Sequence, residues 1–389
     1  MTAVVVTGTG AVSCVGEGVE ALWAGMTAAR SAPVRVSDPF ARMPHPLMYE
    51  VDDARLAPPT GRGRTTDLLV RAAREAWSAA GTPGDVVPGR RIGVVVGTGM
   101  GDSGMHELSR AGEGAEGSAL GPVYSVAGNL ADELGARGPV VSISNACAAG
   151  AYAVAEAVQL LETGECDVVL ACGAESYSRV ALGAFNRMGA IDPTSCRPFS
   201  ADRRGTVFGE GAAVLVLERA DGARARGVTA LASVIGYGLT CDADHPTAPD
   251  PEGGQAQRAM EQALRRAGLT ASDVHAVVPH GTGTGHNDLA ESAVLQRVLG
   301  RADLGPPVYS LKALLGHTGG AAGALAAVAA VEISRRRTVP GNVDVGVLDE
   351  ACPVNLPVGS PVGTGGGHVL VNAYAFGGNN ASILLGDAA

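Results

Sequence analysis

The residue best placed for covalent chemistry is Cys147, which lies between a strand-like run and a helix-like run. The run Val140–Ile143 is apolar and rich in β-branched residues, which predicts a buried strand. Small residues predominate from Cys147 towards Leu161, which predicts a closely packed helix that ends before Gly164. At a helix N-terminus, unpaired backbone N–H groups and the helix dipole favour a thiolate. Such a thiolate can attack a carbonyl carbon while a nearby N–H group receives the oxyanion.

Three further stretches carry groups that a cysteine nucleophile needs. His280 begins His-Gly-Thr-Gly-Thr, where a histidine after a strand is placed as an acid, a base or a hydrogen-bond donor. Lys312 precedes His317 by five residues, and a helix start at His317 favours a neutral imidazole. Phe376 stands before Gly-Gly at the end of a strand, where the backbone can offer an N–H group. Each stretch alone is weak evidence, because lone histidines and glycine pairs are usually structural.

Lys312 is the only lysine of a chain whose other basic side chains are arginine. A single lysine in that setting indicates a position that requires a compact ammonium group on a flexible stem. A chance surface lysine is the alternative, and its position between two candidate catalytic histidines argues against it.

Strands that end in glycine-rich turns alternate with helix-like stretches along the chain. Such strands occur near Val4, Val94 and Val277, and the helices are expected over residues 65–80, 147–162, 255–267 and 288–299. This alternation predicts an α/β protein with sheets covered on both faces. The pattern is duplicated, with one half over residues 1–219 and a second over residues 228–389. The active site is expected in a crevice between the carboxyl ends of the strands of both halves.

Composition excludes several classes of protein. The 389 residues include 46% hydrophobic and 17% charged residues, which is typical of a globular chain. The net charge of −10 argues against a nucleic-acid partner, and no stretch is long and apolar enough to span a membrane. The seven cysteines lack metal-ligand spacing and indicate reduced thiols in the cytoplasm, with no metal site. The Gly8-Thr9-Gly10 turn lacks the third glycine of a dinucleotide site.

Taken together, the four stretches resemble the β-ketoacyl synthases of the thiolase fold. The resemblance rests on Asn-Ala-Cys-Ala-Ala-Gly around Cys147, His-Gly-Thr-Gly-Thr at His280, Lys312 before Gly-His-Thr-Gly-Gly at His317, and Ala-Phe-Gly-Gly-Asn-Asn at Phe376. It implies a duplicated α-β-α-β-α layered fold. It also implies an acyltransferase that forms carbon–carbon bonds by decarboxylative Claisen condensation.

The resemblance also assigns a role to each residue. Cys147 would carry the acyl chain, His280 and His317 would stabilise the enolate of the malonyl group, and Lys312 would tune the histidines. The backbone N–H groups of Cys147 and Phe376 would form the oxyanion hole, with Phe376 as gate. Three residues would contact the substrate: Thr282, Thr284 and Met105. No cofactor is implied, because the acyl groups arrive on the phosphopantetheine of an acyl carrier protein.

One departure from the family pattern keeps other functions open. The family's buried glutamate in the helix after the second histidine is replaced by Ala326. Its loss leaves room for an acyltransferase or hydrolase that loads Cys147 without elongating the chain. A non-elongating partner subunit is a third hypothesis, which retention of Cys147, His280 and His317 disfavours.

The expected partners follow from the resemblance and from charge. A discrete type II component would act with an acidic carrier protein, as a homodimer or with a chain-length-factor-like subunit. We expect a local basic patch at the docking site, with Arg62 and Arg64 as candidates and Arg71 and Arg74 on the following helix. An ordinary solvated helix face is the alternative interpretation of these arginines.

Overall fold

The strands meet in one continuous hydrogen-bonded path that sets the order of the whole fold. The computed structural model describes residues 3–52, 61–112, 121–300 and 305–388. The path runs β11-β14-β15-β10-β1-β9-β7-β5-β6. Its strands are β1 (Val4–Ser13), β5 (Ile92–Gly97), β6 (Val140–Ile143), β7 (Val168–Glu175), β9 (Gly211–Arg219), β10 (Ala232–Cys241), β11 (Ala276–Val278), β14 (Val369–Tyr374) and β15 (Asn379–Gly386).

The pairing directions show where the two parts of the chain join. Strands β5, β6 and β7 run parallel, as do β11 and β14. Strand β1 lies antiparallel to both β9 and β10, so the strands of residues 1–219 meet those of residues 228–389 at the β1–β10 pair. The other described strands are short: β2 (Gly16–Glu17), β3 (Val34–Arg35), β4 (Leu47–Tyr49), β8 (Phe208–Gly209), β12 (Thr338–Val339) and β13 (Val362–Gly363). Strand β2 pairs with β1, β12 pairs with β13, and β3, β4 and β8 form a small sheet.

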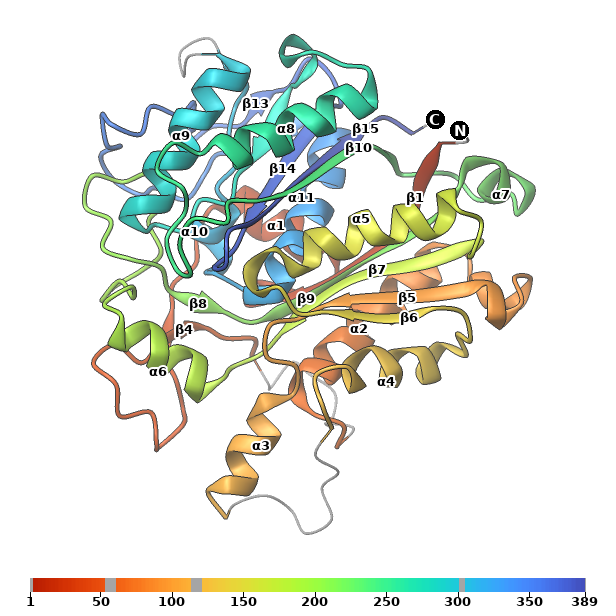
Figure 1. The fold of residues 1–389 in the computed structure, drawn as a ribbon, viewed down its shortest axis with the longest axis horizontal. Helices are drawn as coiled ribbons and strands as arrows, with labels where there is room; N and C mark the ends of the chain where they lie inside the picture. Colours follow the sequence, from red (N-terminus) through yellow and green to blue (C-terminus); the bar gives the residue numbers. More distant parts are fainter. Residues whose placement is uncertain (1–2, 53–60, 113–120, 301–304, 389) are drawn as a thin grey trace.

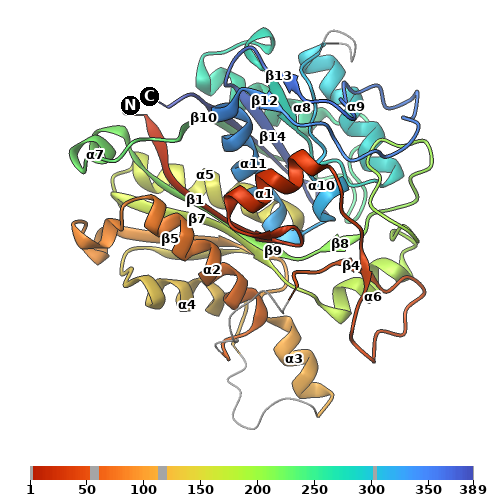
Figure 2. The same cartoon turned by 180° about the vertical axis from the view of Figure 1, so that it is seen from behind.

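The helices and strands stack in five layers (Figure 1), which confirms the predicted α/β layered fold. Helices α5 (Ala149–Glu162) and α11 (Ala322–Arg336) form the middle layer. On one side lie β5, β7 and β9, covered by α2 (Arg64–Ala79) and α4 (Ser125–Leu134). On the other side lie β10, β14 and β15, covered by α8 (Gly254–Ala267) and α9 (Gly285–Leu299). The remaining helices are α1 (Val19–Ala28), α3 (Ser103–Arg110), α6 (Arg179–Arg187), α7 (Ala220–Ala225) and α10 (Leu311–Leu315). Figure 2, the view from behind, shows α1 in front of α11, which it contacts.

The two middle helices touch through glycines at their first turns. A Cβ on Gly150 of α5 would lie 2.7 Å from the carbonyl oxygen of Gly320, which precedes α11. A Cβ on Gly323 of α11 would collide with the backbone of Ala151. Because protein interiors are close-packed, such a contact forms only where side chains are absent. The many small residues of both helices thus bring two helix N-termini together at the centre of the molecule.

Strand β6, which leads to Cys147, is not the buried strand that its apolar sequence predicts. It pairs with β5 alone and forms the edge of the sheet among the described strands. Val140 is 43% exposed and the other residues of the strand are half-buried. Local apolar patterning does not distinguish an edge strand that a partner could cover from a strand buried within its own chain.

We expect Gly323→Ala to destabilise the fold, because the added methyl group has no space between α5 and α11. The free energy of unfolding in urea should fall by about 2 kcal/mol, as is usual for overpacked cores. Gly128→Ala on α4 is the matched control, since a Cβ there meets nothing within 4 Å. An unchanged unfolding free energy for Gly323→Ala would contradict the close approach of the two helices.

Candidate active site

Cys147 lies on a tight turn between β6 and α5. The turn passes through the 3₁₀ segment η4 (Ala146–Ala148), and Ala146 takes a left-handed φ of 55°. Burial raises the pKa of the Cys147 thiol to about 12, a larger effect than the lowering by the Lys312 charge. The resting side chain is therefore a thiol. The expectation of a thiolate was wrong, because burial penalises the charged sulfur more than the helix end favours it.

His317 is the group that can accept the thiol proton. Its Nε2 atom lies 2.9 Å from the Cys147 Sγ atom. Burial, and secondarily the Lys312 charge, holds the pKa of His317 well below its usual value, so the imidazole is neutral. The neutral state matches the sequence prediction, although burial rather than a helix end is the main cause. A neutral imidazole at this distance can remove the proton as the sulfur attacks.

His280 and Lys312 complete the cluster beside this pair. The His280 ring is perpendicular to the His317 ring, with centroids 5.5 Å apart. The Lys312 Nζ atom donates a hydrogen bond to the His280 carbonyl oxygen and lies 3.4 Å from His280 Nδ1. Burial, followed by the charge of Lys312, holds the pKa of His280 well below its ordinary value. With Nδ1 facing an ammonium group, His280 carries its hydrogen on Nε2 and is a neutral donor.

Glu291 is the carboxylate that acts most strongly on Lys312, and the sequence analysis did not identify it. Burial lowers the Lys312 pKa, and Glu291 opposes this effect more than any other charge. The carboxylate of Glu291 accepts hydrogen bonds of 2.7 Å from the backbone N–H groups of His280 and Gly281. Burial raises its own pKa to about 7. Ala326, which replaces the family's glutamate, is buried in α11 and offers Lys312 no charge.

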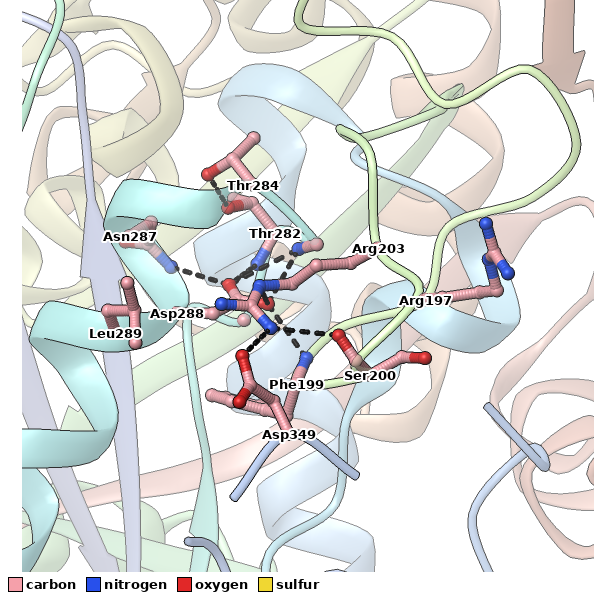
Figure 3. Close-up of polar contacts among 12 residues, drawn as sticks. Arg197, Phe199, Ser200, Arg203, Thr282, Thr284, Asn287, Asp288, Leu289 and Asp349 are labelled. Carbon is pink, nitrogen blue, oxygen red and sulfur yellow. Dashed lines mark hydrogen bonds and ion pairs between the residues drawn. The ribbon is translucent and has the colours of Figure 1, made fainter. Parts of the chain in front are cut away.

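A second buried carboxylate, Asp288, fixes the loop that follows His280 (Figure 3). It accepts backbone hydrogen bonds from Phe199 at 2.7 Å, Thr282 at 3.1 Å and Gly283 at 3.2 Å. Arg203 lies beside it, with its Nε atom 3.8 Å from Asp288 and its Nη1 atom 2.6 Å from Asp349. Asp288 and Glu291 stand three residues apart on one face of α9, and that spacing was the available sequence signal.

Two cavities meet at Cys147. The first encloses about 240 Å³ and is lined mainly by apolar side chains, including Met48, Met100, Leu182 and Phe208. The second encloses about 330 Å³ and is lined by His280 and His317, by two further histidines, His245 and His286, and by other polar groups. Three residues line both cavities: Cys147, Phe185 and Phe376.

The two phenylalanines form the wall between the cavities. Their rings are stacked, with centroids 5.1 Å apart and planes within 3° of parallel. Phe185 comes from α6 and was missed by the sequence analysis, whereas Phe376 was identified from its motif. The sulfur thus lies where an apolar chamber and a polar chamber join.

The remaining predicted site residues fall in different places. Thr282 and Thr284 line the second cavity, with their hydroxyl oxygens 2.8 Å apart. Met105 lies on α3 and lines a third cavity, so it does not contact the first one as predicted. The chain turns at Gly101, which leaves Met100 at the Cys147 cavity and carries α3 away from it.

The candidate docking arginines are held in ion pairs. Arg62 and Arg74 both pair with Glu133, at 3.3 and 2.6 Å. Arg64 pairs with the buried Glu210 at 2.5 Å, and Arg71 pairs with Glu17 at 3.1 Å. In the described ranges no cluster of His, Cys, Asp and Glu side chains suits a metal ion. Nor does any helix there have the length and apolar character needed to cross a membrane.

Alkylation of Cys147 by iodoacetamide should increase steadily with pH. Because its thiol pKa is about 12, the thiolate fraction and the rate should rise roughly tenfold per pH unit from pH 7 to pH 10. Peptide-resolved mass spectrometry separates this reaction from that of the exposed Cys241. A rate that levels off below pH 9 would mean that the thiolate already exists in the resting protein.

Asp288→Asn should lower stability and weaken the His280 loop together. An amide turned towards three backbone N–H groups leaves buried donors unpaired, which costs about 2–5 kcal/mol of unfolding free energy. Urea denaturation measures this loss. Asp349→Asn is the control, because Asp349 is partly exposed and should cost less than half as much. Equal losses for the two variants would argue against the central position of Asp288.

Comparisons with known proteins give the family. The model of the β-ketoacyl synthase N-terminal domain matches residues 59–223, and the model of its C-terminal domain matches residues 231–345. Nodulation protein E of Rhizobium meliloti is 36% identical over 330 residues, covering 83% of this chain and 82% of the relative. The 3-oxoacyl-[acyl-carrier-protein] synthase 2 of Mycobacterium bovis is 32% identical over 98% of this chain and 97% of its own length.

A solved structure of a ketosynthase is similar to this chain over its whole length. The ishigamide ketosynthase/chain length factor superimposes with a TM-score of 0.88 at 35% identity, covering 100% of both chains. The layered architecture is therefore the thiolase-like fold that the sequence predicts. The chain belongs to the β-ketoacyl synthase family and is an acyltransferase that forms carbon–carbon bonds.

Proposed function

We propose that the chain is a β-ketoacyl-[acyl carrier protein] synthase that extends a Cys147-bound acyl chain with malonyl units in a type II polyketide pathway. The observation that carries this proposal is the Cys147–His317 contact of 2.9 Å at the junction of two cavities. One cavity suits an apolar chain, and the other suits a polar thioester arm. A condensing enzyme needs both, because two thioesters must meet at one sulfur.

In the first half-reaction, His317 takes the Cys147 proton as the sulfur attacks the acyl thioester. The carbon–sulfur bond to the carrier then breaks, and the phosphopantetheine sulfur takes the proton from His317 and leaves as the thiol. His317 is neutral again, and the chain occupies the first cavity. The backbone N–H groups of Cys147 and Phe376 serve as the oxyanion hole, where preorganised donors lower the barrier most. No further cofactor takes part in this scheme.

In the second half-reaction, the malonyl thioester enters the second cavity along Thr282 and Thr284. The bond to its carboxylate breaks, CO₂ leaves, and the electron pair forms an enolate. Neutral imidazoles of His280 and His317 hydrogen-bond the enolate oxygen, and Lys312 orients His280. The enolate carbon then attacks the Cys147 thioester, so a carbon–carbon bond forms and the thiolate leaves.

The proposed partners are an acidic acyl carrier protein and a second subunit. A copy of the chain or a chain-length-factor-like subunit would cover β6, whose half-exposed edge favours such an interface. The polyketide assignment is supported by the similarity to a type II PKS ketosynthase solved with its acyl-carrier protein, which superimposes with a TM-score of 0.89 at 26% identity. Arg62 and Arg64 stay our candidates for carrier docking. The cytoplasm, which keeps thiols reduced, is the proposed compartment for the free cysteines.

Loading without elongation is the second candidate function, and Ala326 is the observation that favours it. Glu291 is the counter-charge that acts most on Lys312, and its pKa of about 7 means that it is partly protonated at neutral pH. A weaker ammonium–carboxylate pair affects the histidines of the second half-reaction more than the loading of Cys147.

Intact-mass analysis with acyl and malonyl carrier proteins separates these functions. We expect an acyl adduct on the wild-type protein and a β-keto product once the malonyl carrier is added. Cys147→Ala should give neither, because the nucleophile is gone. His280→Ala should still load but should condense roughly 10²–10⁴-fold more slowly.

His275→Ala is the matched control, since His275 packs against His368 and lines neither cavity. An adduct without any product in the wild type would identify a loading acyltransferase. No adduct at all would leave a partner subunit as the function.

A further inference from the structure

A third cavity lies next to the one that we assign to the acyl chain. It encloses about 360 Å³ and shares two lining residues with the first cavity, Ser176 and Tyr177. Neither residue lines the second cavity, which meets the first at Cys147. The first cavity therefore lies between the other two, with the nucleophile at one boundary and Ser176–Tyr177 at the other.

The shared wall consists of the two residues that follow β7. Ser176 is buried, and its hydroxyl oxygen lies 2.7 Å from that of Thr65. Tyr177 supplies most of the bulk, because its ring packs against the buried apolar cluster that contains Met48 and Leu182. Without the Tyr177 ring, Ser176 would be the only shared side chain, and the space of the phenol ring would be open.

The Tyr177 ring is anchored at its far end. Its hydroxyl group donates a hydrogen bond of 2.7 Å to Asp38, which also pairs with Arg179 at 2.6 and 2.9 Å. The Arg179 hydrogen bonds and that of Tyr177 hold the pKa of Asp38 below its usual value despite burial. Asp38 is thus a fixed carboxylate, and the phenol is held across the passage.

The two sides of this wall differ in chemistry. The first cavity is lined mainly by apolar groups. The third cavity carries six charged residues, namely Asp38, Glu50, Arg64, Asp102, Glu107 and Arg179. An apolar chain end gains free energy by displacing water from apolar walls, but it loses free energy where it displaces the water around charges.

We propose that Tyr177 closes the far end of the acyl cavity and so sets the longest acyl chain that Cys147 carries. This inference rests on the proposed function, because it takes the first cavity as the acyl site. Tyr177 is a specificity-determining residue in this scheme and takes no part in bond making. Removing its ring lengthens the first cavity by the space that the phenol fills, whereas enlarging the ring shortens that cavity.

The test is a series of saturated acyl-pantetheine thioesters of increasing length, with Cys147 acylation followed by intact mass. For the wild type, kcat/KM should fall sharply beyond one chain length. Tyr177→Ala should move that limit to longer chains, with gains of roughly tenfold or more for chains just beyond it, since one methylene in a fitted pocket counts that much. Tyr177→Trp should move the limit to shorter chains.

Tyr177→Phe is the matched control, because it keeps the ring and removes only the bond to Asp38. It should keep the wild-type limit. An unchanged limit in both Tyr177→Ala and Tyr177→Trp, with short chains still loading, would overturn the proposal. If the wild type loads no thioester of any length, the proposed function fails instead, so the two failures are distinguishable. Opposite shifts for a smaller and a larger side chain do not arise from general destabilisation.

Discussion

The close contact between the first turns of α5 and α11 is the constraint on which the active site depends. Cys147 lies just before α5, and His317 lies just before the turn that leads into α11. The two helices come from different parts of the chain, and each brings its reactive residue to the place where the helices touch. Glycines at Gly150 and Gly323 allow an approach that side chains would block. The sulfur–imidazole distance is thus set by backbone packing, which is stiffer than any single side-chain contact.

Burial then decides the charge of every group at that place. The thiol stays protonated, both imidazoles stay neutral, and the pKa of Lys312 falls below its ordinary value, in each case with burial as the largest cause. A site of low polarity strengthens each hydrogen bond and each charge pair within it. Proton transfer from Cys147 to His317 therefore creates charge only during the reaction, when the sulfur bonds to the acyl carbon. Fixed donors then act on charge that develops in the transition state, which is where they lower the barrier.

The sequence was informative wherever a short motif carries the chemistry. Cys147, His280, His317 and Lys312 each stand in a glycine-rich or helix-initiating stretch, and the structure brings them together. The alternation of strands and helices likewise predicted an α/β protein with covered sheets, and the family resemblance implied the layered arrangement. The residues that were missed act through partners distant in the sequence. Phe185 matters because it stacks on Phe376, and it has no local signal. Glu291 matters because its charge acts on Lys312, and its spacing from Asp288 was the only local signal that it had. The thiolate prediction was wrong for the same reason, since the burial of a side chain is decided by the whole fold.

The two carboxylates of α9 show how the fold orients His280 with an alanine at position 326. Asp288 and Glu291 together hold the backbone N–H groups of residues 280–283, so the loop carrying His280 and Thr282 is tied to one helix. The charge of Glu291 also acts on Lys312, which donates a hydrogen bond to the carbonyl oxygen of the same histidine. The peptide group before His280 is therefore bonded to Glu291, and the peptide group after it is bonded to both Glu291 and Lys312. Such an arrangement fixes the direction of the imidazole without a carboxylate at position 326, because its orientation depends on the loop backbone rather than on α11.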